Sequence, residues 1–106
     1  MYKHLPIVER DIEDTLLYTA REHGPRKYAD YAALIEEALE VLAEDPVKGT
    51  HRPDIHPDAW IYKIAKRGRR ARHLFLYRLG QDGIAVIYGL LYDGMNLPEQ
   101  WRKRAR

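Results

Sequence analysis

Cationic side chains are concentrated in one short stretch of this 106-residue sequence. Six lysines and arginines fall between positions 63 and 72, with no acidic residue among them. Like charges held this close repel one another, so a purely structural role explains their density poorly. Such a group of cations can bind phosphates or the acidic surface of another protein. The six residues are Lys63, Lys66, Arg67, Arg69, Arg70 and Arg72.

A strand–turn–strand pattern overlaps the end of this basic stretch and carries further polar side chains. Residues 72–79 are rich in aromatic and aliphatic side chains, residues 80–83 have turn chemistry, and residues 84–91 form an apolar return strand. The pattern predicts an antiparallel hairpin whose polar side chains lie near the strand ends, where they can project into a groove. The candidate contact residues of this unit and of the segment after it are His73, Tyr77, Arg78, Tyr92 and Trp101.

Cleavage of an RNA backbone is one reaction that these side chains could support. Attack by a 2′-hydroxyl needs a proton acceptor, a proton donor and cations around the phosphorane. Arg72, Arg78 and Lys63 could supply the cations, and Tyr92 is a nearby phenol. A phenol with an ordinary pKa of about 10 is a poor base near neutrality unless neighbouring arginines lower it. His73 titrates in the useful range, although its strand neighbours suggest a place on the surface.

A loose group of His51, Asp54, His56 and Asp58 is the nearest approach to a metal-binding cluster in the sequence. Two prolines interrupt the group and it contains no cysteine, which is typical of a polar loop and not of a metal site. We therefore expect neither a metal nor any other cofactor.

A small basic nucleic-acid-binding module is a further class that the sequence allows. It would hold phosphates with the basic stretch and stack bases on Tyr62, Tyr77 and Tyr88. These tyrosines alternate within apolar strands, so a role in the core explains them better. Salt-dependent association with nucleic acid would support this alternative.

Length and composition predict one domain over residues 1–106, large enough to bury a single core. The absence of cysteine excludes a disulfide framework and thiolate chemistry. No apolar run approaches the length of a membrane span, and the first residues do not resemble a signal peptide. We expect a cytoplasmic protein with no membrane partner.

The net charge of +2 hides a division between the two halves of the chain. Residues 1–59 carry thirteen acidic against seven basic residues, and residues 60–106 carry three against eleven. The halves therefore differ in sign, at −6 and +8. A field polarised in this way attracts an acidic partner to the C-terminal half.

Helical and strand periodicities divide the chain into elements that would position these side chains. The order predicts an α+β fold, with two N-terminal helices packed on one face of a small antiparallel sheet and the other face partly open to a partner. The expected elements are a strand at 2–5, a helix from 6 to the Gly-Pro pair at 24–25, a helix at 25–43, a surface loop at 47–58, strands at 60–64, 72–79 and 84–91, and a short helix at 97–101 before a fraying basic tail.

Several short motifs follow one another over nearly the whole chain. A Leu-Pro pair at 5–6 precedes Glu-Arg-Asp-Ile-Glu at 9–13, and an apolar-acidic run at 39–46 ends in proline. The most specific part is Arg-His-Leu-Phe-Leu-Tyr-Arg at 72–78, then Asp-Gly-Ile at 82–84, then Leu-Leu-Tyr-Asp-Gly-Met-Asn-Leu-Pro at 90–98. In order and spacing these motifs resemble the RelE/ParE superfamily of type II toxin–antitoxin toxins, and its ParE-like branch in particular.

Three positions depart from the pattern of that superfamily. Gly89 stands where many relatives have arginine, Tyr92 where they have histidine, and Asn96 where they have aspartate. These changes affect whether the chain keeps the catalytic residues of its relatives more than they affect the fold.

The resemblance implies the toxin of a plasmid-stabilising toxin–antitoxin system. RelE-like members cut mRNA on the ribosome, whereas ParE-like members poison DNA gyrase without needing a proton shuttle. The branch implies a gyrase inhibitor that is not an enzyme, and ribosome-dependent mRNA cleavage is the alternative. The basic stretch and the helix around Trp101 are the expected contact regions, although packing on the sheet is the simpler role for Trp101.

The resemblance also implies a cognate antitoxin whose C-terminal segment wraps the toxin as helix and extended chain. An acidic amphipathic segment would gain from charge steering and apolar burial on the positive half. Oligomers are expected within the toxin–antitoxin complex.

Overall fold

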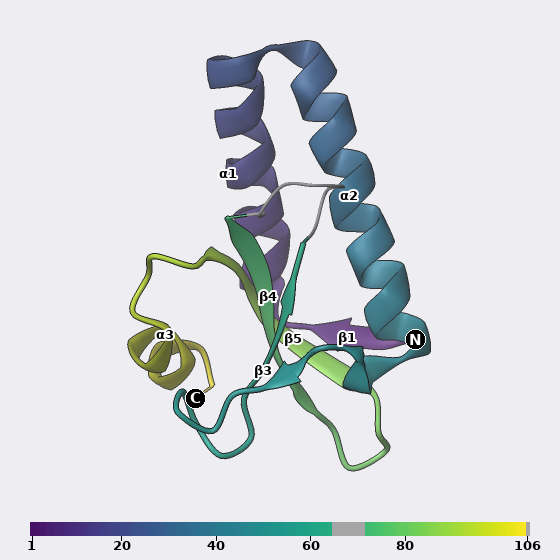
Figure 1. Ribbon diagram of the computed structural model, residues 1–106, viewed down its shortest axis with the longest axis vertical. Coiled ribbons are helices and arrows are strands. Elements are labelled where there is room, and N and C mark those ends of the chain that lie inside the picture. The colour runs from purple at the N-terminus through teal and green to yellow at the C-terminus, as the bar shows by residue number, and fades with distance from the viewer. Residues whose placement is uncertain (65–71, 106) are drawn as a thin grey trace.

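The computed structural model describes residues 1–64 and 72–105. A short strand, β1 (Tyr2–His4), leads into two long helices, α1 (Pro6–His23) and α2 (Pro25–Glu44). Each helix begins at a proline, whose missing N–H has no partner in a first turn anyway. Gly24 joins them with φ 86°, a conformation that glycine adopts readily. The result is an antiparallel helical hairpin that extends well beyond the sheet (Figure 1), and both helices confirm the prediction.

Five strands form one sheet in the order β1-β5-β4-β3-β2. The remaining strands are β2 (Thr50–His51), β3 (Trp60–Lys63), β4 (His73–Leu79) and β5 (Ala85–Tyr92). The neighbouring pairs from β2 to β5 are antiparallel, but β1 runs parallel to β5. The prediction of a wholly antiparallel sheet is therefore wrong at this pair. Most of the chain, including both long helices, separates β1 from β5, which gives the long crossover that a parallel pair needs.

The segment predicted as a surface loop contains regular structure. A short 3-10 helix, η1 (Pro46–Lys48), follows α2, and β2 comes directly after it. The β2 strand is only two residues long and lies at the edge of the sheet, so its own sequence carries almost no alternation by which it could be predicted.

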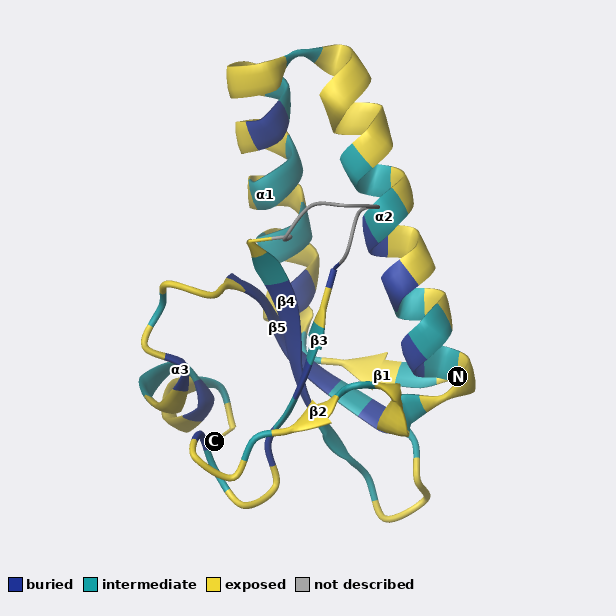
Figure 2. Cartoon of the chain, in the orientation of Figure 1, coloured by how far each residue is buried: buried dark blue, intermediate teal, exposed yellow. Residues whose placement is uncertain are grey.

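Both faces of the sheet are covered. The helical hairpin buries one face with a core that includes Ile35, Leu42, Phe75 and Ile87. A second cluster on the other face brings strand residues together with α3 (Leu97–Arg104) and the segment before β3. The expectation of a partly open face is therefore wrong there. Figure 2 shows the buried residues concentrated along β4 and β5, while exposed residues dominate the outer end of the helical hairpin. The second cluster contains Ile55, Ala59, Ile61, Leu74, Leu76, Tyr88, Leu91, Leu97 and Trp101.

The C-terminal helix is longer than expected. It continues to Arg104, whose guanidinium contacts Asp11 of α1, so the residues predicted to fray are held in place. Asn96 caps the helix by accepting the Glu99 N–H through its side chain at 3.2 Å. In the described part of the chain, no helix has the length and apolar character needed to cross a membrane.

Candidate functional site

Four of the candidate residues meet at one end of the sheet. Lys63 ends β3, His73 begins β4 directly after Arg72, and Tyr92 ends β5. His73 is the cross-strand partner of Tyr92, and the Asp93 N–H donates to the Arg72 carbonyl at 2.8 Å. Strand pairing therefore brings these residues to the same end of the sheet, with His73 and Tyr92 on the face of the helical hairpin and Lys63, the partner of Leu74, on the opposite face. Four further candidates, Lys66, Arg67, Arg69 and Arg70, lie outside the described residues.

His73 is held by a phenol from the helical hairpin. Tyr31 of α2 lies with its hydroxyl 2.5 Å from His73 Nδ1, and the two rings meet edge to face. Burial raises the pKa of Tyr31 to about 12, so the hydroxyl keeps its proton at neutral pH. Burial also lowers the pKa of His73, partly opposed by the nearby Asp93 carboxylate. A neutral phenol and a neutral imidazole therefore share this hydrogen bond at neutral pH.

Tyr92 presents an aromatic ring at the surface. Its side chain is exposed, with the residue 50% accessible. A Cβ at Gly94 would lie 3.1 Å from Tyr92 Cε2, so the ring rests close to the glycine backbone. This closeness to Gly94 limits the orientations that the ring can adopt.

Lys63 and Arg72 differ from the described cations of α3. Both are exposed, and no described carboxylate forms a salt bridge with either. Residues 65–71 contain no acidic residue that could add one. By contrast, Arg102 and Lys103 both lie near Glu99, and Arg104 pairs with Asp11.

Arg78 lies at the opposite end of β4 from Arg72. Six residues of extended chain separate them by roughly 20 Å, so one phosphate cannot contact both guanidinium groups. Arg78 Nε donates instead to the Tyr88 hydroxyl at 2.7 Å. The arrangement of these two arginines around a single reacting phosphate, which RNA cleavage would use, is therefore not present.

Tyr77 and Trp101 are buried. Tyr77 is fully inaccessible and donates its hydroxyl to the Pro46 carbonyl at 2.6 Å. Trp101 stacks on His56 and lies against Tyr88, with ring centroids 5.0 and 4.8 Å away. Both side chains therefore pack the fold, and the simpler role considered for Trp101 is the one observed. Tyr88 is buried as well, which removes it as a stacking platform for bases.

The histidines considered as metal ligands are engaged elsewhere. His51 Nε2 lies 2.6 Å from the Pro57 carbonyl oxygen, and His56 Nδ1 accepts the Asp58 N–H at 3.0 Å. Asp54 holds Arg52 through two hydrogen bonds. Among the described residues, no three histidine or carboxylate side chains are grouped as a metal ion would require.

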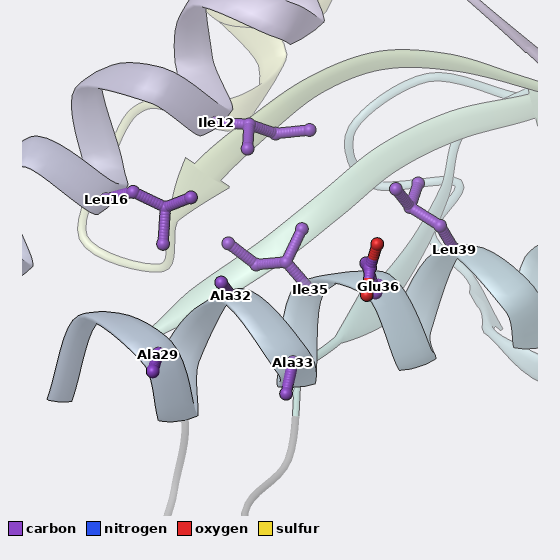
Figure 3. A pocket seen from close by; sticks show the side chains of 8 residues that line it. All are labelled: Ile12, Leu16, Ala29, Ala32, Ala33, Ile35, Glu36 and Leu39. Atoms are coloured by element: carbon purple, nitrogen blue, oxygen red, sulfur yellow. The ribbon is translucent and has the colours of Figure 1, made fainter. Parts of the chain in front are cut away.

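A cleft between the two long helices was not predicted. It has a volume of about 450 Å³ and opens between α1 and α2. Figure 3 shows Ile12 and Leu16 of α1 pointing toward Ala32 and Ile35 of α2. The alanines at 29, 32 and 33 leave this space, and they recur at helical spacing in the sequence. That spacing of small residues could have predicted the cleft. The lining residues are Ile12, Leu16, Ala29, Ala32, Ala33, Ile35, Glu36 and Leu39.

One family model matches the chain. Its description is ParE toxin of type II toxin-antitoxin system, parDE, and it matches residues 2–97, from β1 to the first residue of α3. A search of curated proteins gave no match.

Proposed function

We propose that this chain, which belongs to the ParE toxin family of type II toxin–antitoxin systems, stops cell growth by binding DNA gyrase. The family match over residues 2–97 is the observation that carries the proposal. Gyrase poisoning is the activity that the resemblance to the ParE-like branch implies. The proposed setting is the cytoplasm, in a system that stabilises a plasmid.

Binding without catalysis suits the described residues better than RNA cleavage. A general base needs a free lone pair near neutral pH. His73 Nδ1 is engaged in the hydrogen bond with the Tyr31 hydroxyl, and burial lowers the pKa of this imidazole, so His73 takes up a proton less readily near neutral pH. Arg72 and Arg78 lie too far apart to surround one phosphorane. Inhibition by surface contact needs neither group.

An antitoxin partner follows from the type II family. We propose that an acidic amphipathic segment of this antitoxin covers the positive half of the toxin and neutralises it. The charge of +8 over residues 60–106 supports such pairing. Mixed oligomers of toxin and antitoxin are the expected form of the complex.

The gyrase proposal can be tested with purified toxin in two parallel reactions. One reaction measures supercoiling of relaxed plasmid by DNA gyrase, and the other measures translation with mapping of mRNA ends. Loss of supercoiling without new mRNA ends supports gyrase as the target. New mRNA ends with normal supercoiling would establish the ribonuclease alternative instead. Adding the protein encoded by the adjacent reading frame should restore supercoiling if that protein is the antitoxin.

A further inference from the structure

We infer that the cleft between α1 and α2 is the surface through which the toxin binds its target, and that it takes a basic amphipathic helix of that protein. This inference deepens the proposed function and rests on it. The cleft has a volume of about 450 Å³ and a mostly apolar lining. Its mouth is open, because Ala29, Ala33 and Glu36 line it and are exposed to solvent.

The shape of the cleft suits a third helix. Small side chains at 29, 32 and 33 of α2 let another backbone come close, and Ile12 and Leu16 of α1 lie half-buried opposite them (Figure 3). Packed helices place their axes 8–10 Å apart, with the shorter distances at small side chains. An extended segment fits worse, because its backbone N–H and C=O groups would face apolar side chains without hydrogen-bond partners.

The length of the cleft sets the length of the partner helix. On α2 the lining runs from Ala29 to Leu39, which is about 15 Å of helix at 1.5 Å per residue. A partner helix of about three turns would cover this distance. Its apolar residues would recur at helical spacing on the face that enters the cleft, as in other helix-in-groove complexes.

Four exposed carboxylates border the cleft, two on each helix. Glu36 lines it directly, and a second glutamate follows one turn later on α2. On α1, two glutamates precede the lining residues Ile12 and Leu16 by three positions each, which places them on the same side of the helix. These rim carboxylates are Glu9, Glu13, Glu36 and Glu40.

The described cations leave most of this rim charge unbalanced. Glu9 lies 3.8 Å from His4 Nε2, but no described residue forms a salt bridge with the other three rim carboxylates. The whole helical hairpin, residues 6–44, carries ten acidic residues against four lysines and arginines. A partner helix with lysine or arginine on both sides of its apolar face would complement the two acidic edges of the cleft.

The same negative charge disfavours other occupants. A second copy of the chain would bring an identical acidic rim, and the phosphates of nucleic acid or of an anionic lipid surface would be repelled as well. The antitoxin segment proposed above is acidic and pairs with the positive half of the toxin, which leaves the cleft for the target. An enzyme that binds DNA, such as gyrase, carries lysines and arginines that neutralise phosphates, so basic segments are available on it.

Two matched pairs of variants test the inference. Ala32→Phe fills the cleft and is compared with Ala105→Phe, which adds the same ring to an exposed alanine after α3. The double variant Glu36→Lys/Glu40→Lys is compared with Glu37→Lys/Glu44→Lys, which makes the same change of charge on α2 at exposed residues outside the cleft lining. Urea unfolding establishes that each variant is folded. Growth arrest on induction and inhibition of gyrase supercoiling are the two readouts.

We expect both cleft variants to lose about tenfold or more in potency, and both controls to keep wild-type potency. Wild-type potency of the folded charge variant would overturn the basic partner, and wild-type potency of both cleft variants would overturn the cleft as the target site. Each result leaves gyrase as the target. If the wild type arrests growth without inhibiting gyrase, and the cleft variants do not arrest growth, the gyrase proposal fails and the cleft stands.

Two further measurements separate the other protein occupants. The protein encoded by the adjacent reading frame should bind the cleft variants as tightly as it binds the wild type. If the cleft variants still inhibit gyrase but no longer bind this protein, the cleft belongs to the antitoxin and the inference is wrong. A wild-type dimer in analytical ultracentrifugation that Ala32→Phe abolishes would assign the cleft to a second copy of the chain instead.

Discussion

Asp11 and Arg104 form an ion pair that joins the first long helix to the last. Arg104 Nη1 donates to Asp11 Oδ2 at 2.6 Å, across 93 positions of sequence. The same carboxylate oxygen accepts the Leu90 N–H, and the same Nη1 donates to the Tyr88 carbonyl, each at 3.1 Å. Because β1 pairs with β5 only at residues 85–87, these two side chains take the place of a neighbouring strand along the next part of β5.

Removing the guanidinium should destabilise the fold. Only 11% of the Arg104 side chain and 14% of the Asp11 side chain are accessible, so Arg104→Ala leaves a mostly buried carboxylate without its cation. We expect a loss of about 1–3 kcal/mol in the free energy of unfolding, measured by urea titration. Arg102→Ala is the matched control, since that side chain is 74% exposed and should change stability by less than about 0.5 kcal/mol. Equal stability of the two variants would show that the ion pair contributes nothing.

Gly89 gives this ion pair its space. A Cβ at position 89 would lie 2.6 Å from Arg104 Nη1 and 3.2 Å from Asp11 Oδ2. Gly89→Ala should therefore displace Arg104 and cost about 1–3 kcal/mol of stability. In an Arg104→Ala background the obstructing group is gone, so the same substitution should cost less than half as much. If the two substitutions instead lower the free energy of unfolding additively, the cost of Gly89→Ala does not come from a clash with Arg104.

The pH dependence of stability should carry a contribution from His73. Burial lowers its pKa in the folded protein below the ordinary 6.5, so the unfolded chain binds more protons in the window below that value. The stabilising contribution of neutral His73 is fully present above pH 6.5 and is lost as pH falls through the folded pKa. The free energy of unfolding should fall by at most about 1.4 kcal/mol per pH unit from this group. We expect wild type to lose more stability than His73→Asn between pH 7.5 and 5.5. Parallel losses in urea unfolding would show that His73 does not contribute.

Sequence patterns predicted the helices and the hairpin because their signals are local. Pro6 and Pro25 mark the helix starts, and apolar residues recur at helical spacing behind them. The parallel pairing of β1 depends on contacts between distant segments, which no local pattern encodes. The covered second face did leave a local signal, because residues 74–77 of β4 form a continuous buried run instead of alternating, as in a strand covered on both faces.

The candidate site was predictable to the same extent. The sequence grouped Arg72, His73, Arg78 and Tyr92 at strand ends. The structure places Arg72, His73 and Tyr92 at one end of the sheet with Lys63, but Arg78 lies at the opposite end of β4. The roles of Tyr77 and Trp101 could not be read from sequence, because their partners come from η1, the segment before β3 and the middle of β5.

Tyr77 should stabilise the protein through its hydroxyl as well as its ring. The hydroxyl donates to the Pro46 carbonyl at 2.6 Å in a fully buried position beneath Gly49. Tyr77→Phe removes that donor and keeps the ring, so we expect a loss of about 0.5–1.5 kcal/mol at pH 7, measured by urea unfolding. Tyr18→Phe removes an exposed hydroxyl instead, and should leave the stability at pH 7 unchanged.

Alkaline pH provides an independent check on the same hydroxyl. Burial raises the pKa of Tyr77 to about 12, above its ordinary value of 10.0. The folded state therefore favours the neutral phenol, and its contribution is intact below pH 10 and lost as pH rises from 10 toward 12. Wild type should lose more stability than Tyr77→Phe over this range, so the difference between the two proteins should shrink. If the difference in free energy of unfolding between the two proteins stays constant from pH 7 to pH 11, the pKa of Tyr77 is not raised by folding. The hydroxyl would then stabilise the protein only through its hydrogen bond to Pro46.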